Sequence, residues 1–324
     1  MSTEKTLKKF KTEEGTFELA KHVFGQGSPV CGVLSGVHGD EFLARKVAEH
    51  LKENLENHVF NGTVHIVSDA NIFACDEGRR MTPWPRFEKN EGEMRDLNRC
   101  FKMAFENMNS KNKLNTTQLI AREILREFKK FDFVLDLHNA TSGGFKVDQT
   151  RLKVSNGIPQ ETIFEMEKMA KNSGTDFVMR SAPSWLGGTV SSILPLLKVP
   201  VITFEVSGGS GHDEEDFENY LNYVENVLKF KGVLEGETVV KEPYFFDQIV
   251  SVYSDNYGHL RKFVDLGEFI DPGQTIAEVI DDEGNTVEKI SSEYKGFIES
   301  ITDSDKVIEG SRIVNIGSNG EGFK

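Results

Sequence analysis

Short apolar runs alternate with stretches of helical periodicity over the first two thirds of the chain. The run Val30–Ser35 is small and apolar, lies between Pro29 and Gly36, and predicts a buried strand. Behind it, apolar residues recur at helical spacing from Leu43 to Leu51 with charges between them, which predicts an amphipathic helix. The same patterns predict further strands at 63–68, 131–138, 176–179 and 199–206, and helices at 115–128, 163–169, 190–197 and 213–231.

Strands that alternate with helices of this length are typical of a mostly parallel sheet. We therefore predict an α/β fold in which helices cover both faces of the sheet. The start of one helix is marked by a capping-box-like sequence, Asn115-Thr-Thr-Gln118, followed by apolar residues at helical spacing.

The pattern changes near residue 240. From Glu242 onward the chain has short β-prone runs separated by turns and no convincing helix. Gly232 and Gly236 loosen the chain just before this change. We predict two domains: an α/β domain over residues 1–238 and a small β-rich C-terminal module over residues 239–324.

The composition of the chain argues against some classes of binding partner. The net charge is −14, which argues against nucleic acid and anionic membranes as partners because both would repel the protein. The N-terminal residues contain no apolar run typical of a secretory signal, and no apolar segment approaches the ~18 residues that span a membrane. Cys31, Cys75 and Cys100 have no metal-site spacing and predict reduced thiols in a cytoplasmic protein, with Cys100 as a buried filler.

Polar groups that can carry chemistry stand at the ends of three predicted strands. They are His38 and Glu41 in one turn, His138 at the end of the third strand, and Glu205 near the end of another. The carboxyl ends of neighbouring parallel strands meet along one edge, so we expect these groups to converge. Two histidines and one glutamate leave one position open on a tetrahedral zinc ion. A carboxylate that does not bind the metal is then needed to move a proton, and Glu205 fits that role.

Each of these residues also has a purely structural interpretation. A histidine is more often structural than a ligand, and a strand-end glutamate such as Glu205 is often only solvated. Asp136 lies on the same strand face as His138 and is either a partner of that histidine or an acid bonded to backbone N–H groups, which we favour slightly. The loop Arg95–Arg99 on its spacing alone is best explained as a surface salt-bridge cluster.

Taken together, the sequence resembles the succinylglutamate desuccinylase/aspartoacylase family, zinc hydrolases related to the metallocarboxypeptidases. Gly36-Val-His-Gly-Asp-Glu41 is similar to the family's G-x-H-G-x-E, and Asp96-Leu-Asn-Arg99 to its D-L-N-R. Asp136-Leu-His138 resembles D-L-H, and Thr203-Phe-Glu205 resembles T-x-E. The order and rough separations agree over approximately residues 30–230.

The resemblance implies a metallocarboxypeptidase-like fold and one zinc ion per chain. It implies that His38, Glu41 and His138 bind this zinc and that Glu205 is the general acid/base. The sequence after the D-L-N-R motif, Cys100-Phe-Lys-Met, departs from one branch of the family, so the acyl group stays open.

The resemblance also implies a site for the substrate. Asn98 and Arg99 would hold a substrate carboxylate, and an upstream arginine would polarise the scissile carbonyl. Arg80 is our choice for this arginine, with Arg79 and Arg86 as alternatives.

The C-terminal module resembles a biotinyl/lipoyl-like β module. It has no Met-Lys-Met or Asp-Lys-Ala where a carrier lysine would be modified, so we interpret it as packing or lid material.

We therefore predict a zinc-dependent hydrolase that cleaves the amide bond of an N-acyl amino acid or a related small molecule. Two alternatives are a zinc carboxypeptidase acting on peptides and a non-catalytic zinc- or ligand-binding protein on the same scaffold. The C-terminal module is predicted to restrict access to the site without supplying zinc ligands. The sequence leaves the oligomeric state open.

Overall fold

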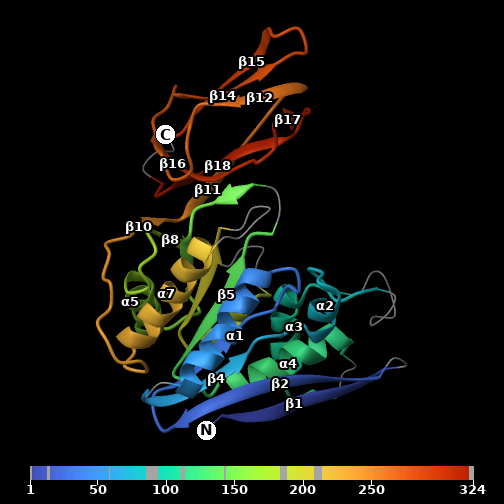
Figure 1. Cartoon of the computed structure of the whole chain (residues 1–324), viewed down its shortest axis with the longest axis vertical. Helices are drawn as coiled ribbons and strands as arrows, with labels where there is room; N and C mark the ends of the chain where they lie inside the picture. The colour runs from blue at the N-terminus through green and yellow to red at the C-terminus, as the bar shows by residue number, and fades with distance from the viewer. Residues whose placement is uncertain are drawn as a thin grey trace.

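The structure is a computed structural model that describes residues 2–12, 15–57, 59–84, 94–110, 114–141, 144–182, 188–207 and 214–320. These residues form one large sheet, two smaller sheets and the helices that cover the large sheet (Figure 1).

The large sheet has nine strands among the described residues, and its centre is parallel. The parallel pairs include β4–β3, β3–β5 and β5–β9, so the strands that carry the candidate site are neighbours. In spatial order the strands are β1 (Thr3–Thr12), β2 (Gly15–Gln26), β4 (Gly62–Val67), β3 (Val30–Leu34), β5 (Phe133–Asn139), β9 (Val201–Val206), β7 (Gln149–Lys153), β8 (Phe177–Ser181) and β10 (Tyr244–Phe246).

Helices pack on both faces of this sheet, so each face has its own hydrophobic core. Alternate residues of one strand enter opposite cores: Leu135 lies in one and Val134 in the other. One face is covered by α1 (Phe42–Asn57), α5 (Gln160–Lys171) and α7 (Glu214–Phe230). The other is covered by α2 (Ile72–Glu77), α3 (Phe101–Glu106), α4 (Thr116–Phe128) and α6 (Val190–Ile193), with the short 3-10 helices η1 (Leu97–Arg99) and η2 (Leu194–Leu197).

The predicted fold class, a mostly parallel sheet with helices on both faces, is confirmed. The capping box of α4 is also present: the Gln118 N–H donates to the Asn115 side chain at 2.8 Å, and the Asn115 N–H donates to the Gln118 side chain at 3.1 Å. Of the described residues, no helix combines the length and apolar character needed to cross a bilayer.

Some elements have no counterpart in the sequence prediction. The hairpin β1–β2 is antiparallel and pairs with β4, and most side chains of β1 are exposed, so the strand lacks an apolar run. Strand β7 consists mainly of polar residues and yet is buried, because its side chains find hydrogen-bond partners inside the protein. Helices α2 and α3 lie in stretches for which the sequence analysis predicts no helix.

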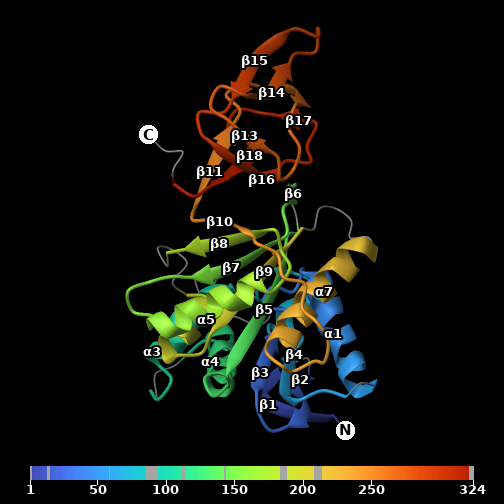
Figure 2. The ribbon, with the colours of Figure 1, turned by 90° about the vertical axis from the view of Figure 1, so that its left-hand side faces the viewer.

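The C-terminal module stacks above the large sheet as two small antiparallel sheets (Figure 2). One contains β11 (Gln248–Tyr253), β18 (Arg312–Ser318), β16 (Gly296–Ile301) and β13 (Phe269–Ile270), and β6 (Phe145–Lys146) pairs with β16. The other contains β15 (Thr286–Ser291), β14 (Thr275–Ile280), β12 (Gly258–Lys262) and β17 (Lys306–Val307). The division at residues 238 and 239 stays a prediction, since β10 follows it in the chain and pairs with β8 of the large sheet.

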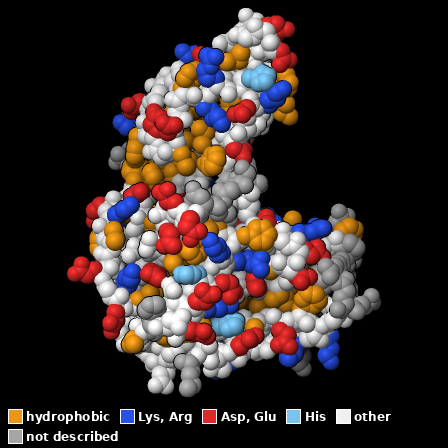
Figure 3. All heavy atoms as spheres, in the orientation of Figure 1, with side chains coloured by type: hydrophobic (Ala, Val, Ile, Leu, Met, Phe, Trp, Pro, Cys, Tyr) orange, Lys and Arg blue, Asp and Glu red, His pale blue; other side chains and the backbone are white. Residues whose placement is uncertain are grey.

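A small aromatic core joins the module to the large sheet. Phe177 of β8 stacks on Phe297 of β16 with ring centroids 4.2 Å apart, and Phe246 packs edge-on against Phe297. In the space-filling view the molecule is narrower near this junction, and hydrophobic side chains gather there (Figure 3).

Candidate active site

The turn after β3 is held by a glycine that no other residue can replace without movement. A Cβ atom on Gly39 would lie 2.1 Å from the carbonyl oxygen of Ala74, a backbone atom of α2. The N–H of Gly39 also donates to the carbonyl oxygen of Arg79 at 2.9 Å. The turn is therefore pressed against α2, and His38, which is 2 % exposed, takes its position from this contact.

His38, Glu41 and His138 form a compact buried cluster. Nδ1 of His38 lies 2.6 Å from Oε1 of Glu41, and Nδ1 of His138 lies 2.8 Å from Oε2 of Glu41. One potential ligand atom from each residue lies within 4.8 Å of the others, and within the described ranges no other such group of histidine, cysteine or acidic residues occurs. The three residues therefore come together as the sequence predicts, although their role as ligands stays a prediction.

Two aspartates face the outer nitrogens of the histidines. Oδ1 of Asp96 lies 3.2 Å from Nε2 of His38, and Oδ1 of Asp136 lies 3.4 Å from Nε2 of His138. The other carboxylate oxygen of Asp136 accepts a hydrogen bond from the Thr203 hydroxyl at 3.1 Å. Asp136 thus contacts side chains, and the favoured interpretation of an acid bonded to backbone N–H groups is wrong.

These residues fit a zinc ion. Two imidazoles and one carboxylate are a ligand set of catalytic zinc, and tetrahedral ligands at ~2 Å from the metal lie ~3.3 Å from each other, which this cluster approaches. An aspartate on the far nitrogen of each histidine is the usual partner of a metal-binding imidazole.

The carboxylates and imidazoles of the cluster stabilise each other's charged forms. Burial alone raises the pKa of Glu41, but His138 and His38 outweigh it, so the pKa of Glu41 is lowered. Burial lowers the pKa of His138, but the carboxylates of Glu41 and Asp136 raise it well above its usual value. The Glu41 carboxylate is therefore ionised at neutral pH and available as an oxygen ligand.

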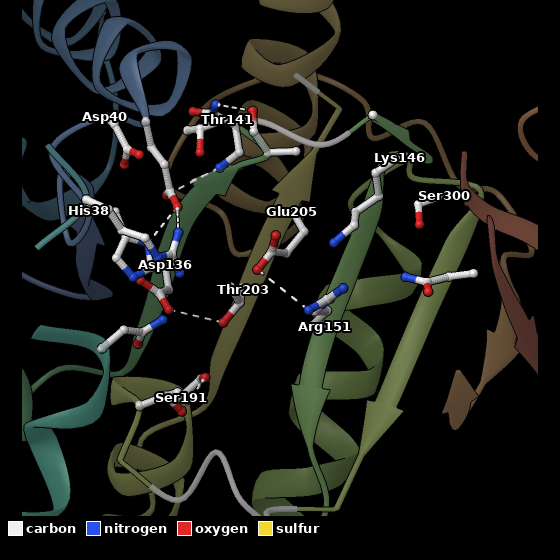
Figure 4. Close-up of a pocket in the computed structure, with 18 of the residues that line it drawn as sticks. His38, Asp40, Asp136, Thr141, Lys146, Arg151, Ser191, Thr203, Glu205 and Ser300 are labelled. Atoms are coloured by element: carbon white, nitrogen blue, oxygen red, sulfur yellow. Dashed lines mark hydrogen bonds and ion pairs between the residues drawn. The ribbon is translucent and has the colours of Figure 1, made fainter. Parts of the chain in front are cut away.

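Glu205 lies beside the cluster on the neighbouring strand. It is paired in register with His138, and its side chain points toward Arg151 of β7, with Oε1 3.6 Å from Nη1 (Figure 4). Burial raises the pKa of Glu205, but Arg151 and Lys146 outweigh it and lower the pKa to about 2. Within the described part of the chain, this ionised carboxylate pairs with Arg151 and forms no ion pair with either histidine, so it is a separate acidic group beside the cluster.

The candidate arginines are placed differently. Nη1 of Arg80 lies 3.5 Å from Oε1 of Glu41, and Arg80 lines the cavity over the cluster. The guanidinium of Arg79 is mostly exposed and pairs with Glu77, outside the cavity lining. Arg86 lies outside the described residues.

Asn98 and Arg99 lie on η1 and reach the same cavity. The Asp96 side chain caps this helix by accepting from the Asn98 N–H at 2.9 Å, so one aspartate both orders η1 and faces His38. A Cβ on Gly188 would lie 2.4 Å from the Arg99 carbonyl oxygen, so η1 also packs closely against the start of α6. Arg99 is not part of a surface salt-bridge cluster among the described residues.

The cavity that joins these groups has a volume of about 610 Å³. Besides the predicted residues, it is lined by residues from the C-terminal module and from β6 and β7 that sequence reasoning did not find: Lys146, Arg151, Lys153, Ser300, Arg312 and Asn315. The polar composition of 145–153 could have signalled Lys146, Arg151 and Lys153, but no sequence signal marks the three residues of the C-terminal module. Tyr220 was also not found; its hydroxyl donates to the backbone oxygen of His138 at 2.9 Å from beneath the site.

Solved structures with low sequence identity share this fold over nearly the whole chain. A succinylglutamate desuccinylase from Silicibacter sp. TM1040 is 17% identical with a TM-score of 0.78, covering 98% of this chain and 95% of that chain. The product-bound ectoine utilization protein EutE (DoeB) from Ruegeria pomeroyi is 18% identical with a TM-score of 0.78 and the same coverage of 98% and 95%. A putative succinylglutamate desuccinylase/aspartoacylase family protein from Shewanella amazonensis is 15% identical with a TM-score of 0.72, covering 100% and 99%.

A comparison with curated protein sequences finds no match. The family model for the succinylglutamate desuccinylase/aspartoacylase catalytic domain matches residues 30–231, which include every predicted site residue. The match covers more than half of the chain, and the chain therefore belongs to the succinylglutamate desuccinylase/aspartoacylase family.

Proposed function

We propose that this protein is a zinc-dependent hydrolase that cleaves the amide bond of an N-acyl amino acid or a related small molecule. The observation that carries the proposal is the buried cluster of His38, Glu41 and His138 with the separate ionised carboxylate of Glu205 in the same cavity. Membership of a deacylase family agrees with this chemistry.

His38, Glu41 and His138 would hold one zinc ion. When bound, zinc would supply Lewis acidity that polarises a carbonyl group and makes water a stronger nucleophile near neutral pH. Asp96 and Asp136 would fix the two imidazole rings through their outer nitrogens.

Glu205 would be the group that moves the proton. It would take a proton from the attacking water as the oxygen bonds to the carbonyl carbon. It would then give this proton to the amide nitrogen as the carbon–nitrogen bond breaks. Arg151, 3.6 Å away, would orient the ionised carboxylate before the first step, and by lowering the pKa of Glu205 it would favour release of the proton in the second step.

Arg80, Asn98 and Arg99 would place the substrate. Arg80 lies within 3.5 Å of Glu41 and so stands beside the carbonyl that is to be polarised. Arg99 would bind the amino-acid carboxylate through its planar guanidinium, and Asn98 would hydrogen-bond the same group.

The size of the cavity favours a small substrate over a peptide. A volume of about 610 Å³ suits a ligand of a few tens of atoms, and residues of the C-terminal module form part of its wall. We also propose that the protein works in the cytoplasm, because all three cysteines are free and buried.

The test is the substitution Glu205→Gln, which removes the proton acceptor and keeps the size of the side chain. We expect zinc content and melting temperature to stay at the parent values while hydrolysis falls by roughly 10²–10⁴-fold. Glu218→Gln, on the exposed face of α7, serves as the matched control and should leave hydrolysis unchanged. His138→Ala should lose the zinc.

Three results would contradict the proposed function. If Glu205→Gln hydrolyses N-acyl amino acids as fast as the parent, Glu205 does not move the proton. If Glu205→Gln loses its zinc, Glu205 is a ligand and the ligand set is wrong. A parent that binds zinc and substrate without hydrolysis would be a binding protein.

A further inference from the structure

Among the described residues, six basic and four acidic side chains line the cavity, an excess of positive charge in a protein whose net charge is −14. Basic side chains reach it from both parts of the fold, so they are brought together by the tertiary structure and not by one sequence motif. They are Arg80, Arg99, Lys146, Arg151, Lys153 and Arg312.

Three of these cations have acidic partners. Nη2 of Arg151 lies 3.3 Å and Nζ of Lys146 lies 3.7 Å from Oε1 of Glu299, a fully buried residue of β16. Arg80 lies 3.5 Å from the carboxylate of Glu41. Each of these three cations therefore has a carboxylate within 3.7 Å.

Arg312 is exposed, and the two remaining cations, Lys153 and Arg99, differ from these three. Lys153 is 5 % exposed, and its ammonium group donates to the Ser181 hydroxyl at 2.7 Å. Arg99 donates to the backbone oxygen of Asn98 at 2.9 Å. In the part of the chain that the structure describes, neither cation has a carboxylate within ion-pair distance. A buried ammonium group without a counter-ion is costly, so the position calls for an explanation.

The neighbours of Lys153 make its charge more costly still. Arg151 precedes it by two residues, and side chains two apart on a strand point to the same side. Burial and then Arg151 lower the pKa of Lys153 to about 8; Glu205 on β9 raises it, and Arg99 lowers it by less than Glu205 raises it. The facing groups are therefore Arg151 on its own strand, Glu205 on β9, Arg99 on η1 and the neutral Ser181 on β8. An anion bound here would relieve the repulsion between the cations.

We propose that Lys153 is a substrate-binding residue that, together with Arg99, binds the carboxylate of the substrate and so selects anionic substrates over neutral ones. The inference rests on the proposed function in taking this cavity as the place where substrate binds. It adds a second cation, from a strand outside every motif of the sequence, to the arginine of the D-L-N-R motif.

The experiment measures how strongly the full-length protein prefers an acid to the matching uncharged amide. The probes are N-acetyl-L-alanine and N-acetyl-L-glutamate, each with its α-carboxamide, and dissociation constants are measured by calorimetry. We expect the parent to bind each acid at least tenfold more tightly than its amide. Lys153→Met should lose about tenfold of this preference, whereas Lys153→Arg should keep it. Lys130→Met, which removes one exposed lysine, is the control for net charge and should also keep the preference.

A pH series adds a readout that a purely structural lysine would not move. The pKa of Lys153 is about 8, so the parent should bind the acids more weakly at pH 9 than at pH 7 as the ammonium group loses its charge. Lys153→Arg should lose less affinity over the same range, because guanidinium stays protonated.

Three results would overturn the inference: equal binding of acid and amide by the parent, no binding of either acid by the parent, or an unchanged preference in a folded Lys153→Met. Hydrolysis of the same compounds is measured separately. If no compound is hydrolysed but Lys153→Met loses the preference, the proposed function fails while the carboxylate site stands. If the acids are hydrolysed and Lys153→Met keeps the preference, only the inference fails.

Discussion

Replacing Glu299 tests whether the buried charges between the C-terminal module and β7 stabilise the fold. Glu299 is fully buried, accepts from Gln149 at 2.7 Å and from Asn315 at 3.2 Å, and faces Arg151 at 3.3 Å and Lys146 at 3.7 Å. We expect Glu299→Gln to destabilise the protein, because it leaves two cations facing an uncharged amide.

The size of the effect follows from these distances. At an effective dielectric constant of ~20, the attractions to Arg151 and Lys146 are worth ~5 and ~4.5 kcal/mol. Most of this gain is offset by the cost of burying the ions, and breaking such a pair costs ~3–5 kcal/mol. Glutamine keeps hydrogen-bonding capacity and Arg151 keeps Glu205 as a partner, so we expect ~3 kcal/mol. For a chain of this size that lowers the melting temperature by roughly 4 °C.

The effect should depend on pH in a defined direction. The pKa of Glu299 is lowered from 4.5, because Lys146 and Arg151 outweigh the raising effect of burial. The stability from its charge is therefore present above pH 4.5 and is lost as the pH falls through the lower pKa of the folded state. Thermal melts of parent and Glu299→Gln should differ most near pH 7 and converge in acid.

A matched control separates this effect from the loss of any acidic residue. Glu293 is exposed in the same module, and Glu293→Gln should change the free energy of unfolding by less than ~0.5 kcal/mol. Equal melting temperatures of Glu299→Gln and the parent at pH 7 would refute the reasoning and show that the cluster contributes no net stability.

Two further predictions concern the site. In Gly39→Ala, the added methyl group would lie 2.1 Å from the backbone of Ala74, so the turn must shift by ~1 Å. We expect this variant to bind zinc more weakly in a metal titration. An unchanged zinc affinity would show that the turn does not position the ligands. Arg99→Lys keeps the charge but loses the two-point contact, so KM for carboxylate-bearing substrates should rise about tenfold in steady-state assays; unchanged kinetics on all of them would argue against the role of Arg99.

The strands and helices with strong periodicity are predictable from the sequence, because their apolar residues face a core. Strand β3 and helices α1 and α4 belong to this group, and each buries its apolar face. The convergence of His38, His138 and Glu205 follows from parallel topology, because neighbouring strands end at the same edge. Strand order and motif position are therefore enough to predict this part of the site.

The rest of the site depends on contacts that leave no local pattern. Strand β7 carries Arg151 and Lys153, and its polar sequence looks exposed although Gln149 and Thr150 are fully buried. Their burial depends on partners far along the chain, such as Glu299, which is 150 residues away from Gln149. Hydrogen bonds between polar side chains that lie far apart in the sequence cannot be inferred from periodicity.

Each part of the chain contributes one strand to a sheet of the other part, and this limits where the chain can be divided. Strand β10 lies after the predicted boundary at residue 238 but completes the edge of the large sheet next to β8. Strand β6 lies long before that boundary but pairs with β16. A fragment that stops at residue 240 would leave the edge of β8 and the ring of Phe177 uncovered, which invites aggregation. The chain therefore has no position at which the two parts can be separated without exposing a strand edge, whether in expression of a shortened protein or by loss of this module during evolution. The two parts are expected to be inherited, folded and degraded together.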